Sequence, residues 1–170
     1  MFASHFFRSY VAALLVGVSF LNHAEALCVL NVTKVTDLRF GSMVVVSGGT
    51  LTVNPTTGFR SGSANVVTPT QINNNVGPAQ FRVTGQGIGL VKYSLSLDSP
   101  SAINAGTKAM ALSAFVTSPG IAAERASILC SAILETINVG ATLQVTSSQT
   151  PGNYTSSEPI VLTSKLLPLL

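Results

Sequence analysis

The chain has 170 residues, of which only 9% are charged and 46% are apolar, and its formal net charge is +3. A chain of this size makes one ordinary domain with a core of its own. Its basic residues are scattered singly, whereas proteins that follow a phosphate backbone gather Lys and Arg on one face. The composition therefore argues against a nucleic-acid partner and predicts a neutral surface rich in hydroxyl groups.

The first 26 residues have the three parts of a secretory signal peptide. Arg8 stands in the leading region, an apolar stretch runs from Tyr10 to Leu21, and Ala24-Glu25-Ala26 forms a small-x-small exit. We expect cleavage after Ala26, which leaves residues 27–170 as a single domain. A retained membrane anchor is the alternative, but it needs about 20 apolar residues and this stretch is shorter. After cleavage no membrane-spanning segment is expected.

Two cysteines, Cys28 and Cys130, follow the expected cleavage site. An even number of cysteines in an exported chain favours a disulfide, because export leads to an oxidising compartment. The bond would close a loop of about 100 residues, for which the chain-entropy model gives roughly 4.7 kcal/mol. Two buried thiols that act as small apolar side chains are the alternative.

In the first half of the exported chain, short apolar alternations separated by Gly, Pro, Asn and Ser predict strands. Strands are expected in residues 27–35, 38–41, 43–46, 50–53 and 64–67. The segment Ser47-Gly48-Gly49 predicts a turn that joins residues 43–46 and 50–53 in a hairpin. The polar stretch Gln71–Asn75 predicts an exposed loop.

The second half continues the pattern, with clear alternation in residues 79–84 and 91–97. Further strands are expected in 109–116, 126–132, 136–145 and 160–163, although Ala122–Ile133 is alternatively one short helix. About eight to ten strands in one domain predict an all-β, two-sheet immunoglobulin-like β-sandwich. Its expected core contains Phe40, Leu51, Phe81, Tyr93, Leu95, Leu143, Tyr154 and Leu162.

Catalytic chemistry has few candidates in this chain. Both histidines, His5 and His23, lie in the leader, so the exported domain contains no imidazole. Hydrolytic triads generally need a base, most often His. A glycosidase pair needs two carboxylates at a set separation, and the sequence brings no two together. We therefore expect no enzyme and no catalytic residue. The five acidic residues after the leader are Asp37, Asp98, Glu124, Glu135 and Glu158.

Metal and cofactor motifs are equally scarce. The sequence has no closely spaced Cys and His pairs and no EF-hand pattern, so we expect no metal. Gly85–Gly89 superficially resembles a dinucleotide-binding motif, but its spacing is wrong and it precedes a strand, which predicts a turn and no cofactor. The glycosylation sequons at Asn31 and Asn153 have meaning only in a eukaryotic secretory route, and we assign them to a strand and a turn.

The two ends of the exported chain are apolar. They either cover the edge of the sandwich itself or pair with a neighbouring subunit by strand addition. The residues predicted for such a subunit contact are Leu27, Val29, Leu30, Ile160, Leu162, Leu166, Leu169 and Leu170.

Five motifs follow one another along the exported chain: Thr36–Gly41, Gly48–Val53, Pro78–Gly85, Ile137–Leu143 and Pro151–Tyr154. In this order they resemble a bacterial family of exported domains of unknown function, DUF4402. The resemblance covers nearly all of the exported chain, and it implies a fimbrial-subunit-like β-sandwich in the bacterial envelope with no known catalytic or ligand residues. The chain departs from the family at two places. Members usually end in a tyrosine-bearing strand, whereas here a leucine-rich tail follows Val161–Lys165, and Ile128–Ser131 replaces a glycine-rich segment.

Two functions are compatible with these features. The first is a non-enzymatic structural subunit of a bacterial surface or fimbria-like assembly, which associates through strand edges with itself or with related subunits, and whose need for a periplasmic chaperone stays open. The second is a secreted, monomeric adhesin or glycan-binding module with a loop site near Gln71–Asn75. Both place the protein in the periplasm, on the cell surface or outside the cell.

Overall fold

The computed structural model describes residues 28–63, 66–67, 75–121, 124–127, 129–156 and 158–168. The segment predicted to be a leader, residues 1–26 with the expected cleavage site, lies outside the described residues, as do Leu27, Leu169 and Leu170. Within these ranges the regular structure consists of strands and one 3₁₀ turn, η1 (Cys130–Ala132), so the all-β prediction is confirmed. No helix of the described part is long and apolar enough to cross a membrane.

Seven antiparallel strands form the larger sheet. Five of them follow the order β1-β8-β13-β11-β10, and β4 pairs with the distal part of β13 and with β5. The strands are β1 (Cys28–Thr36), β4 (Gly49–Val53), β5 (Arg60–Gly62), β8 (Ala79–Gly87), β10 (Ala102–Ala105), β11 (Lys108–Ser118) and β13 (Leu134–Val145).

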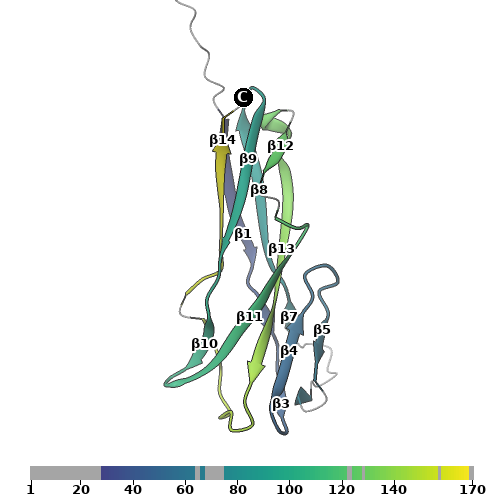
Figure 1. Cartoon of the computed structure of the whole chain (residues 1–170), viewed down its shortest axis with the longest axis vertical. Coiled ribbons are helices and arrows are strands. Elements are labelled where there is room, and N and C mark those ends of the chain that lie inside the picture. Colours follow the sequence, from purple (N-terminus) through teal and green to yellow (C-terminus); the bar gives the residue numbers. More distant parts are fainter. Residues whose placement is uncertain are drawn as a thin grey trace, which may run out of the picture.

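A smaller sheet with the order β12-β9-β14 lies over one half of the larger sheet (Figure 1). Its strands are β12 (Arg125–Ser127), β9 (Val91–Asp98) and β14 (Val161–Leu167). Below it in Figure 1, the larger sheet opens into β10 and β11 on one side and β4 and β5 on the other. Two short ladders complete the described fold: β2 (Arg39–Phe40) with β7 (Val76–Gly77), and β3 (Val44–Val45) with β6 (Val66–Val67). The arrangement is a β-sandwich, as predicted.

Two hydrophobic clusters form the core. The first lies between the two sheets and contains Phe81, Tyr93 and Leu95, and the second lies in the half that the smaller sheet leaves uncovered and contains Phe40 and Leu51. Period-two alternation explains these positions, because every second side chain of a strand faces the same side. Fully burying one such side chain contributes roughly 1.5–3 kcal/mol. Every predicted core residue is buried except Tyr154, which is half-buried against the second cluster.

The predicted hairpin between residues 43–46 and 50–53 is wrong. β3 pairs with β6, whereas β4 pairs with β13 and β5. Gly48 has φ +81°, and a Cβ there would lie 2.8 Å from the backbone nitrogen of Ser147, so this turn fits against the end of β13. The central position of β4 buries Leu51 and Val53 on one face. That burial outweighs a local hairpin, which would leave both side chains half-covered.

Neither interpretation of residues 122–133 holds as a whole. β12 ends at Ser127, and Cys130–Ala132 form the 3₁₀ turn. The turn is fixed by the Cys28–Cys130 disulfide, whose Cα atoms are 5.8 Å apart, and by the Cys130 N–H, which donates to the Gly89 carbonyl over 2.9 Å. The predicted disulfide is therefore confirmed and the alternative of two buried thiols is wrong. The expected loop at Gln71–Asn75 lies, apart from Asn75, outside the described residues.

Candidate functional site

A groove of about 1370 Å³ lies in the half of the molecule that the smaller sheet leaves uncovered. Its buried lining residues are apolar and include Phe40, Met110 and Leu112. Charged side chains at Lys34 and Glu158 also line it. A groove with buried apolar residues and a few charged residues in its lining is typical of binding sites.

One wall of the groove is the segment that follows β1 and contains β2 and β3. Arg60 of β5 holds this wall, because its Nη1 donates to the carbonyls of Phe40 over 2.6 Å and of Ser42 over 2.8 Å. Partial burial of the guanidinium lowers the pKa of Arg60. Lys34 and Asp37 form an exposed ion pair on the same wall, with 2.6 Å between Nζ and Oδ1, which contributes little to stability.

Another wall is the connection between β13 and β14, whose described residues form no sheet ladder of their own. Asn104 of β10 and Thr155 exchange two backbone hydrogen bonds of 2.7 and 2.9 Å. The Tyr154 hydroxyl donates to the Thr150 carbonyl over 2.7 Å and accepts a hydrogen bond of 2.6 Å from Gln149 Nε2. These bonds keep the irregular wall ordered beside the apolar lining.

The groove opens where the edges of the two sheets meet. Among the described residues, β1 pairs only with β8 and β14 pairs only with β9, so each strand has one free edge. The two strands belong to different sheets and lie along the same side of the sandwich (Figure 1). Lys34, near the end of β1, and Ile160, just before β14, both line the groove. The groove therefore continues the seam between the two free edges.

The residues predicted for a subunit contact have different surroundings at this seam. Val29 is 53% exposed on β1 and Leu166 is 40% exposed on β14. Leu30 and Ile160 are half-buried against the first core cluster. Leu162 is buried and faces that cluster, so its side chain serves the sandwich itself.

Sequence reasoning missed a group of exposed aliphatic side chains at one end of the molecule, which we call the apolar end. It consists of Ile88, Leu90, Leu129 and Leu134, whose exposed fractions are 78%, 52%, 49% and 71%. The Cys130-to-Gly89 hydrogen bond joins its two segments, and a second bond of 3.1 Å runs from the Gly85 N–H to the Ile133 carbonyl. The sequence did contain one signal of this exposed group, since Ile88 stands between two glycines in a turn.

Three polar residues form a cluster that bridges the two sheets. The Tyr93 hydroxyl of β9 donates to Glu135 Oε1 of β13 over 2.8 Å, and Arg125 Nη1 of β12 lies 2.8 Å from Glu135 Oε2. Burial, followed by the hydrogen bond with Glu135, raises the pKa of Tyr93 to about 12. Tyr93 is thus a neutral donor at physiological pH, and the cluster acts as an inter-sheet tie.

The remaining acidic residues do not gather around one point. Glu124 lies 3.1 Å from Lys92 Nζ, and Asp37 is paired with Lys34. Within the described ranges, no group of three or more His, Cys, Asp or Glu is placed to hold a metal ion.

The comparisons with known proteins identify a family. Neither the curated proteins nor the solved structures gave a match. The model of the family described as Domain of unknown function (DUF4402) matches residues 30–163, which run from β1 into β14 and include both walls of the groove. Because the match covers well over half of the sequence, the chain belongs to the DUF4402 family.

Proposed function

We propose that the protein is a non-enzymatic structural subunit of a bacterial surface assembly. It associates with further copies, or with related subunits, through the free edges of β1 and β14 and the groove that continues the seam between them. The observation that carries this proposal is the meeting of two long free edges, from different sheets, at an apolar-lined groove.

Backbone chemistry supports strand addition at this seam. A free edge presents unpaired N–H and C=O groups, which a further strand can satisfy. β1 has nine residues and β14 has seven, so both offer a long ladder. Each carries a single charged side chain, Lys34 and Lys165, and its other side chains are apolar, hydroxyl or amide groups. Each edge therefore carries few of the charges that oppose strand addition.

The groove adds side-chain recognition to the backbone pairing. An extended segment points every second side chain to the same side, so a segment with apolar residues at alternate positions can cover Phe40, Met110 and Leu112 from the groove. The Arg60 hydrogen bonds and the Asn104–Thr155 bridge hold both walls before any partner arrives. Such preorganisation reduces the ordering cost of binding.

The disulfide supports a place outside the cytoplasm, since such bonds persist in oxidising compartments. Together with the leader-like first 26 residues, it favours export to the periplasm, the cell surface or the medium.

Val44 and Val46 provide a matched test of the groove. Val44 lines it and is 56% exposed, whereas Val46 is 66% exposed and lies outside its lining. We expect Val44→Asp to weaken self-association at least about tenfold, or about 1.4 kcal/mol, because a charge enters the apolar contact. Val46→Asp is expected to change it less than about twofold, and both substitutions leave stability within roughly 0.5 kcal/mol.

Sedimentation velocity from micromolar to millimolar protein, with electron microscopy for fibres, measures this association. Equal effects of the two substitutions would show that the groove takes no part in it. A wild-type protein that stays monomeric over the whole range would contradict the structural-subunit proposal, and a positive glycan array for that monomer would favour the adhesin hypothesis.

A further inference from the structure

We propose that β1 exchanges between two copies of the protein, so that the β1 strand of each copy pairs with β8 of the other. The Cys28–Cys130 bond then decides which arrangement is kept. A bond within one copy locks the closed monomer, whereas the same bond between two copies holds the exchanged pair together. The exchange takes place at the edge of β8 that β1 covers, and it requires neither the groove nor the free edges of β1 and β14.

β1 is an edge strand with little of its surface buried. Of its nine residues, only Cys28 is buried, three are half-buried and five are exposed. Two of the half-buried residues, Leu30 and Val32, pack against the first core cluster. Burial therefore holds β1 less firmly than it holds β8, in which Phe81 and Val83 are buried. The ladder with β8 and the disulfide are what keep β1 in place.

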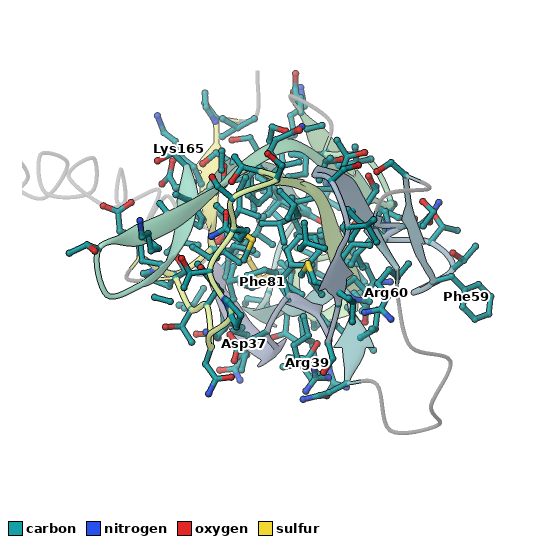
Figure 2. All side chains as sticks on the ribbon, turned by 90° about the horizontal axis from the view of Figure 1, so that it is seen from below. Asp37, Arg39, Phe59, Arg60, Phe81 and Lys165 are labelled. Carbon is teal, nitrogen blue, oxygen red and sulfur yellow. A yellow bond between two sulfur atoms is a disulfide. The ribbon has the colours of Figure 1, made fainter. Side chains whose placement is uncertain are left out.

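The connection from β1 to the next strand is short. Only residues 37 and 38 separate β1 from β2. The ladder is already irregular before this connection, since its register shifts between Lys34 and Thr36. Asp37 lies on the outside of the molecule, whereas Phe81 of β8 lies inside it (Figure 2). Short hinge loops of this kind favour the exchange of an element between copies.

The site that receives β1 is built without any residue of β1. Cys130 is fully buried, and its N–H donates to the Gly89 carbonyl over 2.9 Å. A second bond of 3.1 Å, from the Gly85 N–H to the Ile133 carbonyl, joins the same turn to β8. Gly85 permits this approach, because a Cβ there would lie 2.1 Å from the Cys130 carbonyl oxygen. The β1 strand of either copy can therefore fill this site with the same contacts, which is a low-cost route to a dimer.

The disulfide forms by the same chemistry in both arrangements. A small disulfide such as oxidised glutathione takes two electrons from the Cys28 and Cys130 thiols: its S–S bond breaks, the Cys28–Cys130 bond forms, and the two thiol protons pass to two glutathione thiols. The two Cα atoms are 5.8 Å apart, which suits a disulfide whether Cys28 comes from the same copy or from the other. The protein concentration during bond formation therefore selects the closed monomer or the exchanged pair.

The locked monomer also separates exchange from the association proposed above. Protein that is oxidised as a dilute monomer keeps its own β1, so it still reports the Val44 and Val46 comparison at high concentration. Absence of exchange leaves that comparison intact. A groove that takes no part in association leaves the exchange intact.

The first test uses the wild-type protein in an unlabelled and a heavy-isotope form. Equal amounts are unfolded and reduced together, then refolded in glutathione redox buffer at low micromolar and at near-millimolar concentration. Digestion without reduction, followed by mass spectrometry, shows whether the Cys28 and Cys130 peptides of each bond come from one form or from both. We expect at least about tenfold more hybrid pairs at the higher concentration, because exchange follows mass action. An equal background of hybrid pairs at both concentrations would overturn the proposal.

The second test uses the register of the ladder, because random cross-linking of misfolded chains also gives hybrid bonds. Val32 stands opposite Val83, whose side chain is fully buried. Val32→Cys and Val83→Cys are placed in separate chains, each of which also carries Cys28→Ser and Cys130→Ser, and the two chains are refolded together. In the control, Leu134→Cys replaces Val83→Cys, since Leu134 is 71% exposed and lies outside the ladder of β1.

We expect the mixture of Val32→Cys and Val83→Cys to give at least about fivefold more mixed disulfide dimer than the control mixture, because opposite residues of an antiparallel ladder lie within reach of a disulfide. Collisions between chains favour the exposed position, so random cross-linking gives the reverse order. An equal or larger yield with Leu134→Cys would show that β1 does not exchange.

Discussion

Single residues decide how closely strands and loops approach one another in this fold. Gly140 is a clear case, because a Cβ there would lie 2.1 Å from the Val53 carbonyl oxygen and 2.7 Å from Pro55 Cδ. The end of β4 and the Asn54–Phe59 turn rest directly on the backbone of β13. No flexible side chain can move aside to relieve this contact.

We predict that Gly140→Ala destabilises the protein by about 1–3 kcal/mol, since an added methyl group overpacks a backbone contact. Denaturant unfolding with the disulfide intact measures this change. Gly120→Ala is the control, because nothing lies within 4 Å of its added Cβ, and a change below about 0.5 kcal/mol is expected there. Equal losses would contradict the close-contact explanation.

The raised pKa of Tyr93 predicts that the protein loses stability at alkaline pH. Its pKa is raised from 10.0 to about 12 by burial and by the hydrogen bond to Glu135. Below pH 10 the folded and unfolded forms are both protonated, and the stabilisation is fully present. Between pH 10 and 12 the unfolded form releases the proton while the folded form keeps it, so stability falls as pH rises.

The Tyr93→Phe variant should lose this part of the pH dependence, while at neutral pH it loses roughly 0.5–1.5 kcal/mol with its hydrogen bond. Unfolding curves recorded at several values between pH 8 and 11.5 measure both effects. Tyr154→Phe removes a half-buried hydroxyl from the groove wall and should retain the alkaline loss. An unchanged slope for Tyr93→Phe would assign the loss to other groups.

At the scale of elements, the free edges separate β1 and β14 from the interior strands. β11 is similar in length to β1, but β8 and β13 lie between these two strands in the order of the larger sheet. Val29 on β1 and Val116 on β11 are almost equally exposed, at 53% and 55%. The two side chains therefore differ in the place of their strand in the sheet more than in their exposure.

This difference yields a matched prediction for the strand edge. Val29→Lys should weaken self-association about tenfold or more, because a charge on an edge strand opposes the addition of another strand. Val116→Lys should leave association within about twofold, since β8 and β13 separate its strand from the free edge of β1 in the larger sheet. Analytical ultracentrifugation compares the two variants. A larger effect at Val116 would place the contact on another face.

At the scale of the whole molecule, β13 unites the two halves. Its first part pairs with β8, and its last part pairs with β4 and β11. Ile137 and Val139 of this strand belong to the first core cluster, whereas Leu143 and Val145 belong to the second. The smaller sheet covers only the first cluster. The half that lacks this cover contains the groove, and the opposite extremity carries the apolar end.

Much of the fold could be predicted from local alternation. The strands around Phe81 and Tyr93 follow from period two, because a strand that is covered on one face buries every second side chain. The disulfide followed from two cysteines behind a leader-like segment. The five ordered motifs indicated the DUF4402 family, which the family match over residues 30–163 confirms.

The sequence could not predict which strands pair with each other. Residues 50–53 suit a hairpin and a central position in a sheet equally well, and only burial against β13 distinguishes the two. The same holds for the cluster of Tyr93, Glu135 and Arg125, because Tyr93 and Glu135 belong to different sheets and meet only when the sheets stack. The groove and the apolar end also arise from segments separated by tens of residues.

The sequence by itself therefore determined which residues form strands, which faces of those strands are apolar and which family the chain resembles, because these properties depend on neighbours in the chain. Only the tertiary structure decided which edges stay free, where the groove opens and which aliphatic side chains remain exposed. Those outcomes depend on which distant strands pair and on which apolar faces pack against each other. Neither can be predicted from a local sequence pattern.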